Sequence, residues 1–343
     1  MIILTNLLTE IVDEGGAKVV NSLIKRLKAA DAGVTVVSCA KTTSACDVLI
    51  PSNKLLLNPR LIRYLWCSGQ EVVYMPAYAR SPFSSVRTFL LSLFTRRRLK
   101  VLLYMHSPIG RLAKVFFRMS GARLIALSED SYQDFRDVMG DKAMYLRTGV
   151  DTERFSPIAK EEKAWLRQKY HLPQDKTIVL HVGHLTEGRN IRRMTELDDR
   201  FHGVLVVSTT DETEEDRALR AAMEACPNLT LIDSYLPAVE EIYQLADVYL
   251  FPVQQQRNCI DVPVSVLEAA ACGIPVVATT YGEMKALHGK AGFYRIEQWD
   301  KAALNDLLAR AVLENVSPRE HVLPYDWRHA VKTLLDGTES TNR

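Results

Sequence analysis

One acidic side chain, Glu268, lies within an otherwise apolar, helix-forming run over residues 263–272. Gly273 follows the run and suits the position after a helix end. Apolar segments at 248–253 and 275–280 flank this helix and predict buried strands. A helix N-terminus has unpaired N–H groups and a partial positive charge, and both attract phosphate. The stretch therefore predicts an anion site at the helix start and a ligand for the Glu268 carboxylate.

A second loop could add a cation to the same edge of the sheet. It follows a predicted strand and contains Gly183, His184 and Arg189. Glycine lets the backbone turn closely, and a guanidinium can bind phosphate oxygens with two parallel hydrogen bonds. An arginine on a loop is usually solvated, so this loop alone is weak evidence. Combined with the helix start near residue 263, it predicts a site for a diphosphate.

Three features of the N-terminal half could also reach a ligand. Gly15 and Gly16 follow the first predicted strand, where they serve either a tight turn into a helix or the close approach of a ligand. His106 directly follows a strand at 101–105, and a structural and a ligand-binding role are equally weighted there. Ser128 ends the next strand, where a helix N-cap is favoured over catalysis.

Strands and helices alternate along the chain, which predicts an α/β fold with doubly wound parallel sheets. The predicted strands are 2–6, 34–38, 48–50, 71–75, 100–105, 123–127, 177–182, 204–208, 229–233, 248–253 and 275–280; the predicted helices are 17–29, 58–67, 82–96, 109–119, 130–138, 160–169, 190–200, 212–225, 238–246, 263–272, 300–314 and 326–336. A connector near 149–157 divides the chain into two domains. The boundaries are 1–155, 156–322 and a final helical segment, 323–343.

Bulk composition agrees with two soluble domains. The chain has 343 residues, 47% of them hydrophobic and 24% charged, with a net charge of +2. This nearly balanced charge does not indicate nucleic acid as a partner. No run approaches the roughly 18 apolar residues of a spanning helix, and the start lacks the features of a signal peptide. Six scattered cysteines without a CxxC pair predict reduced thiols and a cytoplasmic protein.

The stretch 83–100 mixes apolar residues with a cluster of arginines at 96–98. The favoured explanation is a core helix whose basic last turn suits its own dipole. The alternative is a surface that contacts anionic lipid, which would place the protein at the inner face of the membrane.

Taken in order, these motifs resemble the retaining glycosyltransferase family 4 of GT-B fold. The pattern Gly-x-Leu-x-x-x-Arg occupies 183–189, Ala-Asp-Val-x-Leu-x-Pro occupies 246–252, and the Glu-Ala-containing motif occupies 263–278. Residues 147–157 resemble the inter-domain segment of that family, and Trp327 resembles the tryptophan that opens its last helix. The resemblance implies two Rossmann-like domains that face a cleft, with a C-terminal helix crossing back to the first domain.

The resemblance assigns donor-binding roles in the second domain. Glu268 matches the second acid of a Glu-x7-Glu motif and would hold the ribose hydroxyls. Val264 and Ser265 match the backbone amides that cap the diphosphate. Arg189 matches the basic residue that neutralises it.

It also assigns roles around the donor sugar and base. Gly15 and Gly16 match the loop near the donor phosphates, and His106 matches a histidine near the sugar and the acceptor. Tyr235 and Leu236 match the segment beside the nucleobase.

Two positions depart from the family pattern. The first acid of the Glu-x7-Glu motif falls at Ile260, with Asp261 as the neighbouring candidate to replace it. The second basic residue of the family, which follows the glycine of the motif, is His184 here, so diphosphate binding depends more strongly on Arg189.

The implied reaction is transfer of a sugar from a nucleotide-diphosphate sugar to a hydroxyl of a glycan, lipid-linked or small-molecule acceptor, with retention. No cofactor is expected. No metal site is expected either, because the sequence shows no cluster of metal ligands. Asp198 and Asp199 are interpreted as a solvated pair at a helix end. The alternatives are a nucleotide-sugar epimerase of the same fold and a non-catalytic two-domain sugar-binding protein. A nicotinamide dehydrogenase is disfavoured because no GxGxxG motif follows the first strand.

Overall fold

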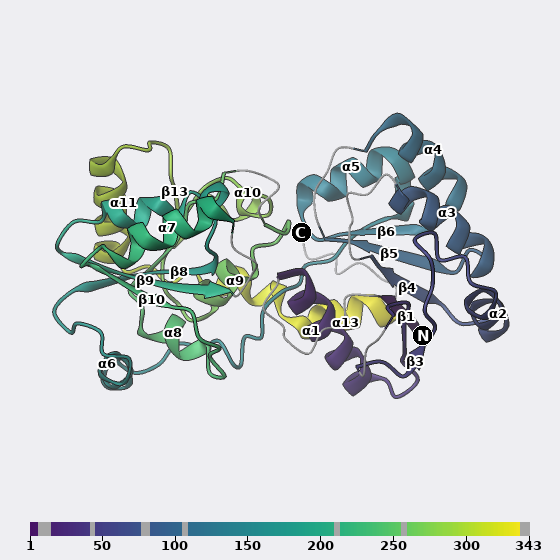
Figure 1. Cartoon of the computed structure of the whole chain (residues 1–343), viewed down its shortest axis with the longest axis horizontal. Coiled ribbons are helices and arrows are strands. Elements are labelled where there is room, and N and C mark those ends of the chain that lie inside the picture. Colours follow the sequence, from purple (N-terminus) through teal and green to yellow (C-terminus); the bar gives the residue numbers. More distant parts are fainter. Residues whose placement is uncertain are drawn as a thin grey trace. The chain divides into compact units, whose positions relative to one another are not determined.

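A computed structural model describes residues 1–5, 15–41, 45–76, 83–104, 109–208, 213–254 and 259–336. The chain forms two compact units (Figure 1). Unit 1 comprises Met1–Thr148, Ile260–Val262 and Trp327–Arg343, and unit 2 comprises Gly149–Cys259 and Pro263–Asp326.

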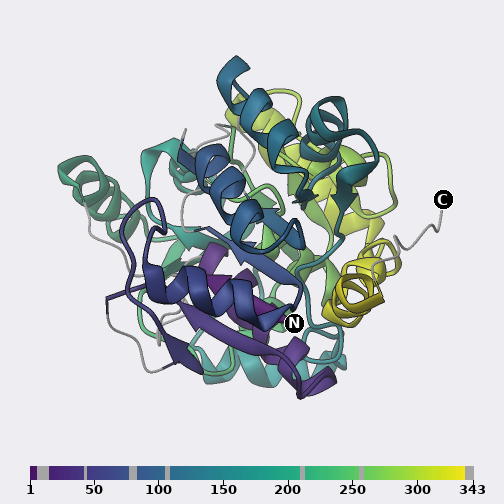
Figure 2. The ribbon, with the colours of Figure 1, turned by 90° about the vertical axis from the view of Figure 1, so that its right-hand side faces the viewer.

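Unit 1 is built around a parallel sheet whose strands follow the order β3-β2-β1-β4-β5-β6-β7. The strands are β1 (Ile2–Thr5), β2 (Thr35–Ser38), β3 (Val48–Leu49), β4 (Val72–Met75), β5 (Leu99–Leu103), β6 (Arg123–Ala126) and β7 (Ala143–Tyr145). The helices are α1 (Gly15–Ala30), α2 (Pro59–Ser68), α3 (Phe83–Phe94), α4 (Arg111–Ser120), α5 (Glu129–Met139) and α13 (Trp327–Asp336). Figures 1 and 2 show its strands between helices.

Each face of this sheet is covered by its own set of helices. One core cluster joins the sheet to α2 through α5, by way of Leu61, Leu91, Phe117 and Phe135. On the remaining side α1 packs against α13, the last helix of the chain. Burial of these apolar side chains is the main force that holds such layers together.

Unit 2 contains a second parallel sheet, in the order β10-β9-β8-β11-β12-β13. Its strands are β8 (Thr177–His184), β9 (Phe201–Ser208), β10 (Leu229–Ile232), β11 (Val248–Phe251), β12 (Val276–Ala278) and β13 (Phe293–Arg295). Its helices are α6 (Lys160–Lys169), α7 (Glu214–Glu224), α8 (Glu240–Leu245), α9 (Val264–Ala271), α10 (Met284–Leu287), α11 (Lys301–Glu314) and α12 (Arg319–Val322). Both sheets are Rossmann-like, as the sequence predicts.

The predicted helix over 190–200 is wrong. Two 3₁₀ segments stand there instead, η2 (Glu187–Arg189) and η3 (Ile191–Glu196). Asn190 separates them with a left-handed backbone, φ 58°, and so prevents a continuous α-helix. The strand β13 was not predicted, because its three residues are too short to show a periodicity.

Candidate functional site

The candidate site of unit 2 lies at the carboxyl edge of its sheet, where β8 and β11 are neighbours. The chain continues from β8 to β9 on one side and from β11 to β12 on the other. Such a switch in strand order opens a crevice at the carboxyl ends of the two strands, and ligands of open α/β sheets bind there. The loop after β8 contains Arg189, and the segment after β11 leads into α9.

The Arg189 side chain is held tightly against the backbone of β8. It is only 8% exposed. A Cβ atom on Gly183 would lie 2.2 Å from Arg189 Nη1, so only glycine leaves space for the guanidinium. Within the described part of the chain, the Arg189 guanidinium has no hydrogen bond and no ion pair to another side chain. A buried cation without a carboxylate is costly, and an anionic ligand would relieve that cost.

His181 lies next to Arg189 and was assigned no role from the sequence. Its side chain is fully buried, and Nδ1 donates to the Leu250 carbonyl at 2.8 Å. Nε2 is buried without a hydrogen-bond partner and would lie 3.3 Å from a Cβ on Gly183. Burial, with a smaller contribution from the Arg189 charge, lowers the pKa of His181 from 6.5 to about 4. The imidazole is therefore neutral, and a histidine within an apolar strand is the signal that could have identified it.

The start of α9 presents backbone amides without a side-chain cap. Pro263 is the N-cap residue and forms no side-chain cap hydrogen bond. Val264 and Ser265, the two residues predicted to bind the diphosphate, are the first two of the helix. The Ser265 side chain interacts with the hydroxyl of buried Tyr249, whose pKa is raised by burial. An uncapped helix N-terminus is the physical requirement for the predicted anion site.

Glu268 is buried one turn further along α9, with 1% of its surface exposed. The Tyr243 hydroxyl donates to Glu268 Oε2 at 2.8 Å. Burial and then the Glu268 charge raise the pKa of Tyr243, so the phenol stays protonated and remains a donor. The acid that looks out of place in the sequence is thus held by a tyrosine from α8.

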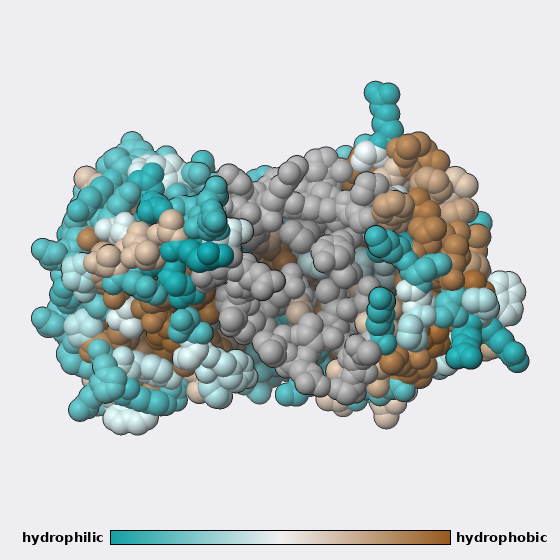
Figure 3. All heavy atoms as spheres, in the orientation of Figure 1, coloured by the Kyte–Doolittle hydropathy of each residue, from teal (hydrophilic) through white to brown (hydrophobic). Residues whose placement is uncertain are grey.

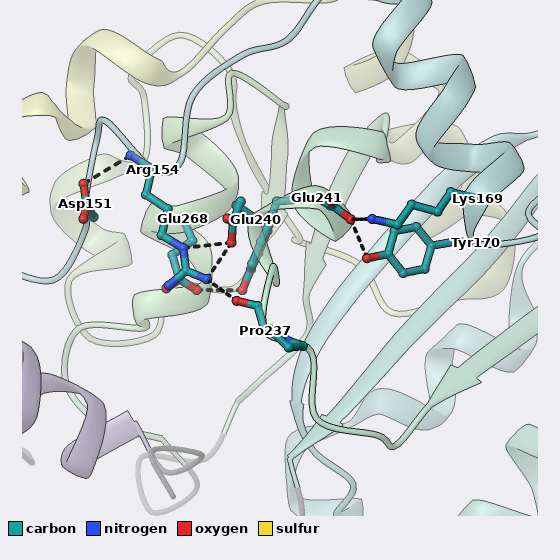
Figure 4. Close-up of polar contacts among 9 residues, drawn as sticks. Asp151, Arg154, Lys169, Tyr170, Pro237, Glu240, Glu241 and Glu268 are labelled. Atoms are coloured by element: carbon teal, nitrogen blue, oxygen red, sulfur yellow. Dashed lines mark hydrogen bonds and ion pairs between the residues drawn. The ribbon is translucent and has the colours of Figure 1, made fainter. Parts of the chain in front are cut away.

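Figure 4 shows Arg154 between Glu268 and Glu240, a position that the sequence did not predict. Its Nε donates to Glu240 Oε2 at 2.8 Å and its Nη2 to the Pro237 carbonyl at 2.9 Å. Burial alone would lower the pKa of Arg154. The hydrogen bond and charge of Glu240, together with the charge of Glu268, outweigh burial and raise that pKa. Arg154 therefore fixes the segment that contains Tyr235. The Tyr235 side chain itself is 75% exposed.

The remaining predicted residues of the donor segment and the loop after β8 are placed as follows. Leu236 is half-buried, next to Pro237. His184 is the last residue of β8 and directly follows Gly183. Lys169 and Tyr170 both hydrogen-bond Glu241 on α8, which gives that helix a second anchor (Figure 4).

In unit 1, the described parts of the predicted site surround Tyr104. Gly15 and Gly16 begin α1, and a Cβ on Gly16 would lie 2.9 Å from the Tyr104 ring. The Asp261 amide donates to the Tyr104 carbonyl at 3.0 Å. His106 lies outside the described residues.

Asp261 belongs to unit 1 through the short segment Ile260–Val262. Its side chain is 1% exposed and accepts hydrogen bonds from the hydroxyls of Ser128, at 3.2 Å, and Ser131. Ser128 is also the N-cap of α5, as predicted. Whether Asp261 also replaces the missing first acid of the motif stays a prediction.

The described residues contain no group of three or more histidine, cysteine, aspartate or glutamate side chains arranged to hold a metal ion.

Part of unit 2 is similar to a known protein family. The family described as Glycosyl transferases group 1 matches residues 176–314. D-inositol 3-phosphate glycosyltransferase of Geodermatophilus obscurus is 26% identical over 239 residues, which are 62% of this chain and 51% of that protein. GDP-mannose-dependent alpha-(1-6)-phosphatidylinositol monomannoside mannosyltransferase of Mycolicibacterium smegmatis is 29% identical over 206 residues, 54% of this chain and 53% of that protein. The chain thus spans about half the length of the curated relatives it matches.

Solved structures match over nearly the whole chain. Anabaena Alr3699/HepE in complex with UDP aligns with a TM-score of 0.74 at 13% identity, covering 98% of each chain. A glycosyltransferase from Rickettsia africae ESF-5 aligns with a TM-score of 0.72 at 15% identity, covering 98% of this chain and 97% of that chain. At these identities the match establishes the fold, which is GT-B with two Rossmann-like domains.

Proposed function

We propose that the protein is a glycosyltransferase that uses a nucleotide-diphosphate sugar, because residues 176–314 match the family described as Glycosyl transferases group 1. One observation carries the proposal. The buried Arg189 guanidinium, which has no anionic partner among the described residues, lies in the loop after β8, and the uncapped α9 follows the neighbouring strand. A cation and a helix N-terminus at one switch point suit the diphosphate of a donor.

The chemistry that we propose is stabilisation of the leaving group. Negative charge grows on the diphosphate as the glycosidic bond breaks. Arg189 and the amides of Val264 and Ser265 would offset that charge, and preorganised groups of this kind usually provide the largest part of the rate enhancement. We propose that these groups suffice without a metal ion and that the sugar is transferred with retention, by attack on the same face that the diphosphate leaves.

The nucleoside would bind next to the diphosphate. Glu268 would accept hydrogen bonds from the ribose hydroxyls, with Tyr243 fixing the carboxylate. The exposed Tyr235 would lie beside the base, in the segment that Arg154 holds. HepE was solved with UDP, which supports a nucleoside diphosphate as the ligand class.

The acceptor is proposed from the names of relatives. These include enzymes named for D-inositol 3-phosphate, for phosphatidylinositol monomannoside and for teichuronic acid biosynthesis, the last in Bacillus subtilis. We propose a hydroxyl of a glycan or lipid-linked acceptor, reached from the cytoplasm. His106 would orient the sugar or that acceptor.

The test is transfer from a panel of nucleotide sugars, read as release of nucleoside diphosphate. Arg189→Ala should lower kcat by about 10²–10³-fold, as does the loss of other groups that stabilise developing charge. Gly183→Ala should show a similar loss because its methyl group would displace the guanidinium. Glu268→Gln should raise the KM for the donor.

Arg192→Ala is the matched control. Arg192 is on the same loop region but is 48% exposed and pairs with Glu187, so its loss should change the rate less than about twofold. Near-normal rates in both Arg189→Ala and Glu268→Gln would disprove the assignment of the site.

A further inference from the structure

Basic residues are concentrated in one part of unit 1. Residues 51–128 contain 13 lysines and arginines and a single acid, Glu71, whereas the rest of the chain has 30 basic and 40 acidic residues. Glu71 pairs with the buried Lys100 at 2.8 Å, so both of these charges are already compensated. The net charge of +2 therefore hides a strongly cationic segment that includes α2, α3 and α4.

Helix α4 exposes apolar side chains in a regular stripe. Leu112, Val115 and Met119 are 77%, 51% and 52% exposed, and their spacing of three and four residues places them on one face of the helix. Of its ten residues, α4 buries only Phe117 and Ser120. A surface helix normally turns such a stripe towards the core, and α4 turns it towards solvent.

Three cations lie beside this stripe. Arg111, Lys114 and Arg118 are all exposed and repeat at the same spacing as the apolar residues. Arg118 donates to the Val138 carbonyl at 3.1 Å. No acidic side chain among the described residues pairs with Arg111 or Lys114. The helix thus exposes parallel apolar and cationic rows.

The neighbouring helices extend this surface. Helix α3 packs against both α2 and α4, and it exposes Phe83 and Leu93. Trp66 of α2 is 48% exposed, with the Arg96 guanidinium 4.6 Å from its ring centroid. Figure 3 shows hydrophobic residues, in brown, gathered where Figure 1 labels α3 and α4, with hydrophilic residues among them.

We propose that α4, together with the exposed residues of α2 and α3, is a docking surface for an anionic lipid bilayer. The helix would lie in the plane of the interface, with Leu112, Val115 and Met119 among the acyl chains and its cations at the lipid phosphates. No described helix is long and apolar enough to cross a membrane. The proposed surface is centred on α4, whereas the sequence pointed to residues 83–100.

The combination of side chains distinguishes this occupant from other polyanions. A nucleic acid would use the cations and stack on aromatic rings, but it would gain little from three exposed aliphatic side chains. A bilayer uses both rows, because apolar burial and attraction to anionic headgroups add. The acids of α5, such as Asp134 and Asp137, mark the limit of the cationic surface.

Vesicle flotation tests the proposal and does not depend on the donor site. The full chain should bind phosphatidylcholine vesicles that contain phosphatidylglycerol, bind pure phosphatidylcholine vesicles far less, and lose binding at high salt. The triple variant Leu112→Ser, Val115→Ser and Met119→Ser should partition at least about tenfold less. Arg111→Gln and Lys114→Gln should each lower partitioning about fivefold.

Matched controls come from unit 2. Leu313→Ser, at an 86% exposed position, and Lys301→Gln, at a 60% exposed lysine, should partition like the unchanged protein. Binding that is equal on neutral vesicles, or unchanged in the α4 variants, would overturn the proposal. The proposal would also be overturned if the protein did not bind vesicles but bound a single-stranded oligonucleotide. It would equally be overturned if the protein formed a dimer that the triple variant abolished. Circular dichroism confirms that each variant is folded.

Discussion

The His181 imidazole couples the stability of unit 2 to pH. Burial holds its pKa near 4, below the 6.5 of an exposed histidine, so the folded state keeps it neutral while the unfolded chain takes up a proton. The neutral imidazole therefore contributes fully to the free energy of unfolding above pH 6.5, and this contribution is lost as the pH falls towards 4. Between about pH 8 and about pH 5 this loss amounts to about 2 kcal/mol.

We expect His181→Gln to reduce this pH dependence of stability. Glutamine can still donate to the Leu250 carbonyl but does not titrate. Urea unfolding at both pH values should show that the variant loses about 2 kcal/mol less than the unchanged protein on acidification. His202 and His288, whose pKa values burial also lowers, titrate in both proteins and cancel in the comparison. Identical pH profiles for the two proteins would contradict the assignment.

At the level of single residues, the sequence proposed roles only for groups within a recognisable motif. Arg189 and Glu268 were proposed as site residues because their spacing matches a family pattern, and their roles stay predictions. Arg154 and His181 were missed, because their roles depend on contacts with Glu240 and Leu250 that lie more than 60 positions away in the chain. Long-range contacts of this kind leave no periodicity in the sequence.

At the level of elements, the C-terminal end of α9 is closely packed against other segments of unit 2. Gly273 follows the helix with φ 80°, a left-handed conformation that costs other residues energy. A Cβ there would lie 3.2 Å from Pro157 Cγ and from Ser317 Oγ. The glycine is thus needed for its conformation and for the space that it leaves.

Gly273→Ala and Gly289→Ala separate these two requirements. Gly289 has nearly the same conformation, φ 82°, but a Cβ on it would meet nothing within 4 Å. We expect Gly289→Ala to cost about 1 kcal/mol and Gly273→Ala to cost about 1–3 kcal/mol more, because its methyl group would crowd its neighbours. Urea unfolding gives both values. Equal losses would mean that Pro157 and Ser317 can move away at no cost.

Elements with clear periodicity or strong end signals were predicted well. Helix α9 was expected over 263–272 and spans Val264–Ala271, since Pro263 marks its start and Gly273 follows its end. The loop after β8 was expected, but the 3₁₀ segments that replace the helix predicted over 190–200 were not, because 3₁₀ turns around Asn190 share the composition of an α-helix.

At the scale of the whole molecule, the last helix of the chain completes the first unit. Helix α13 packs on α1 in unit 1, as the family resemblance implies. Trp327 is 3% exposed with the Arg26 guanidinium 5.9 Å from its ring centroid, and the buried Lys100 donates to the Leu334 carbonyl at 3.0 Å. The stability of unit 1 therefore depends on residues more than 200 positions from most of its sheet.

Trp327→Ala should consequently weaken unit 1 and leave unit 2 nearly unchanged. Removal of a buried tryptophan costs about 3–5 kcal/mol, whereas Leu335→Ala, at a 38% exposed position of the same helix, should cost less than about 1 kcal/mol. Hydrogen exchange resolves the two units in one experiment. Amides of α1 and β1 should lose protection in Trp327→Ala while those of β8 and β11 keep it. Equal loss in both units would mean that they unfold as one cooperative body, and an unchanged α1 would mean that α13 does not stabilise it.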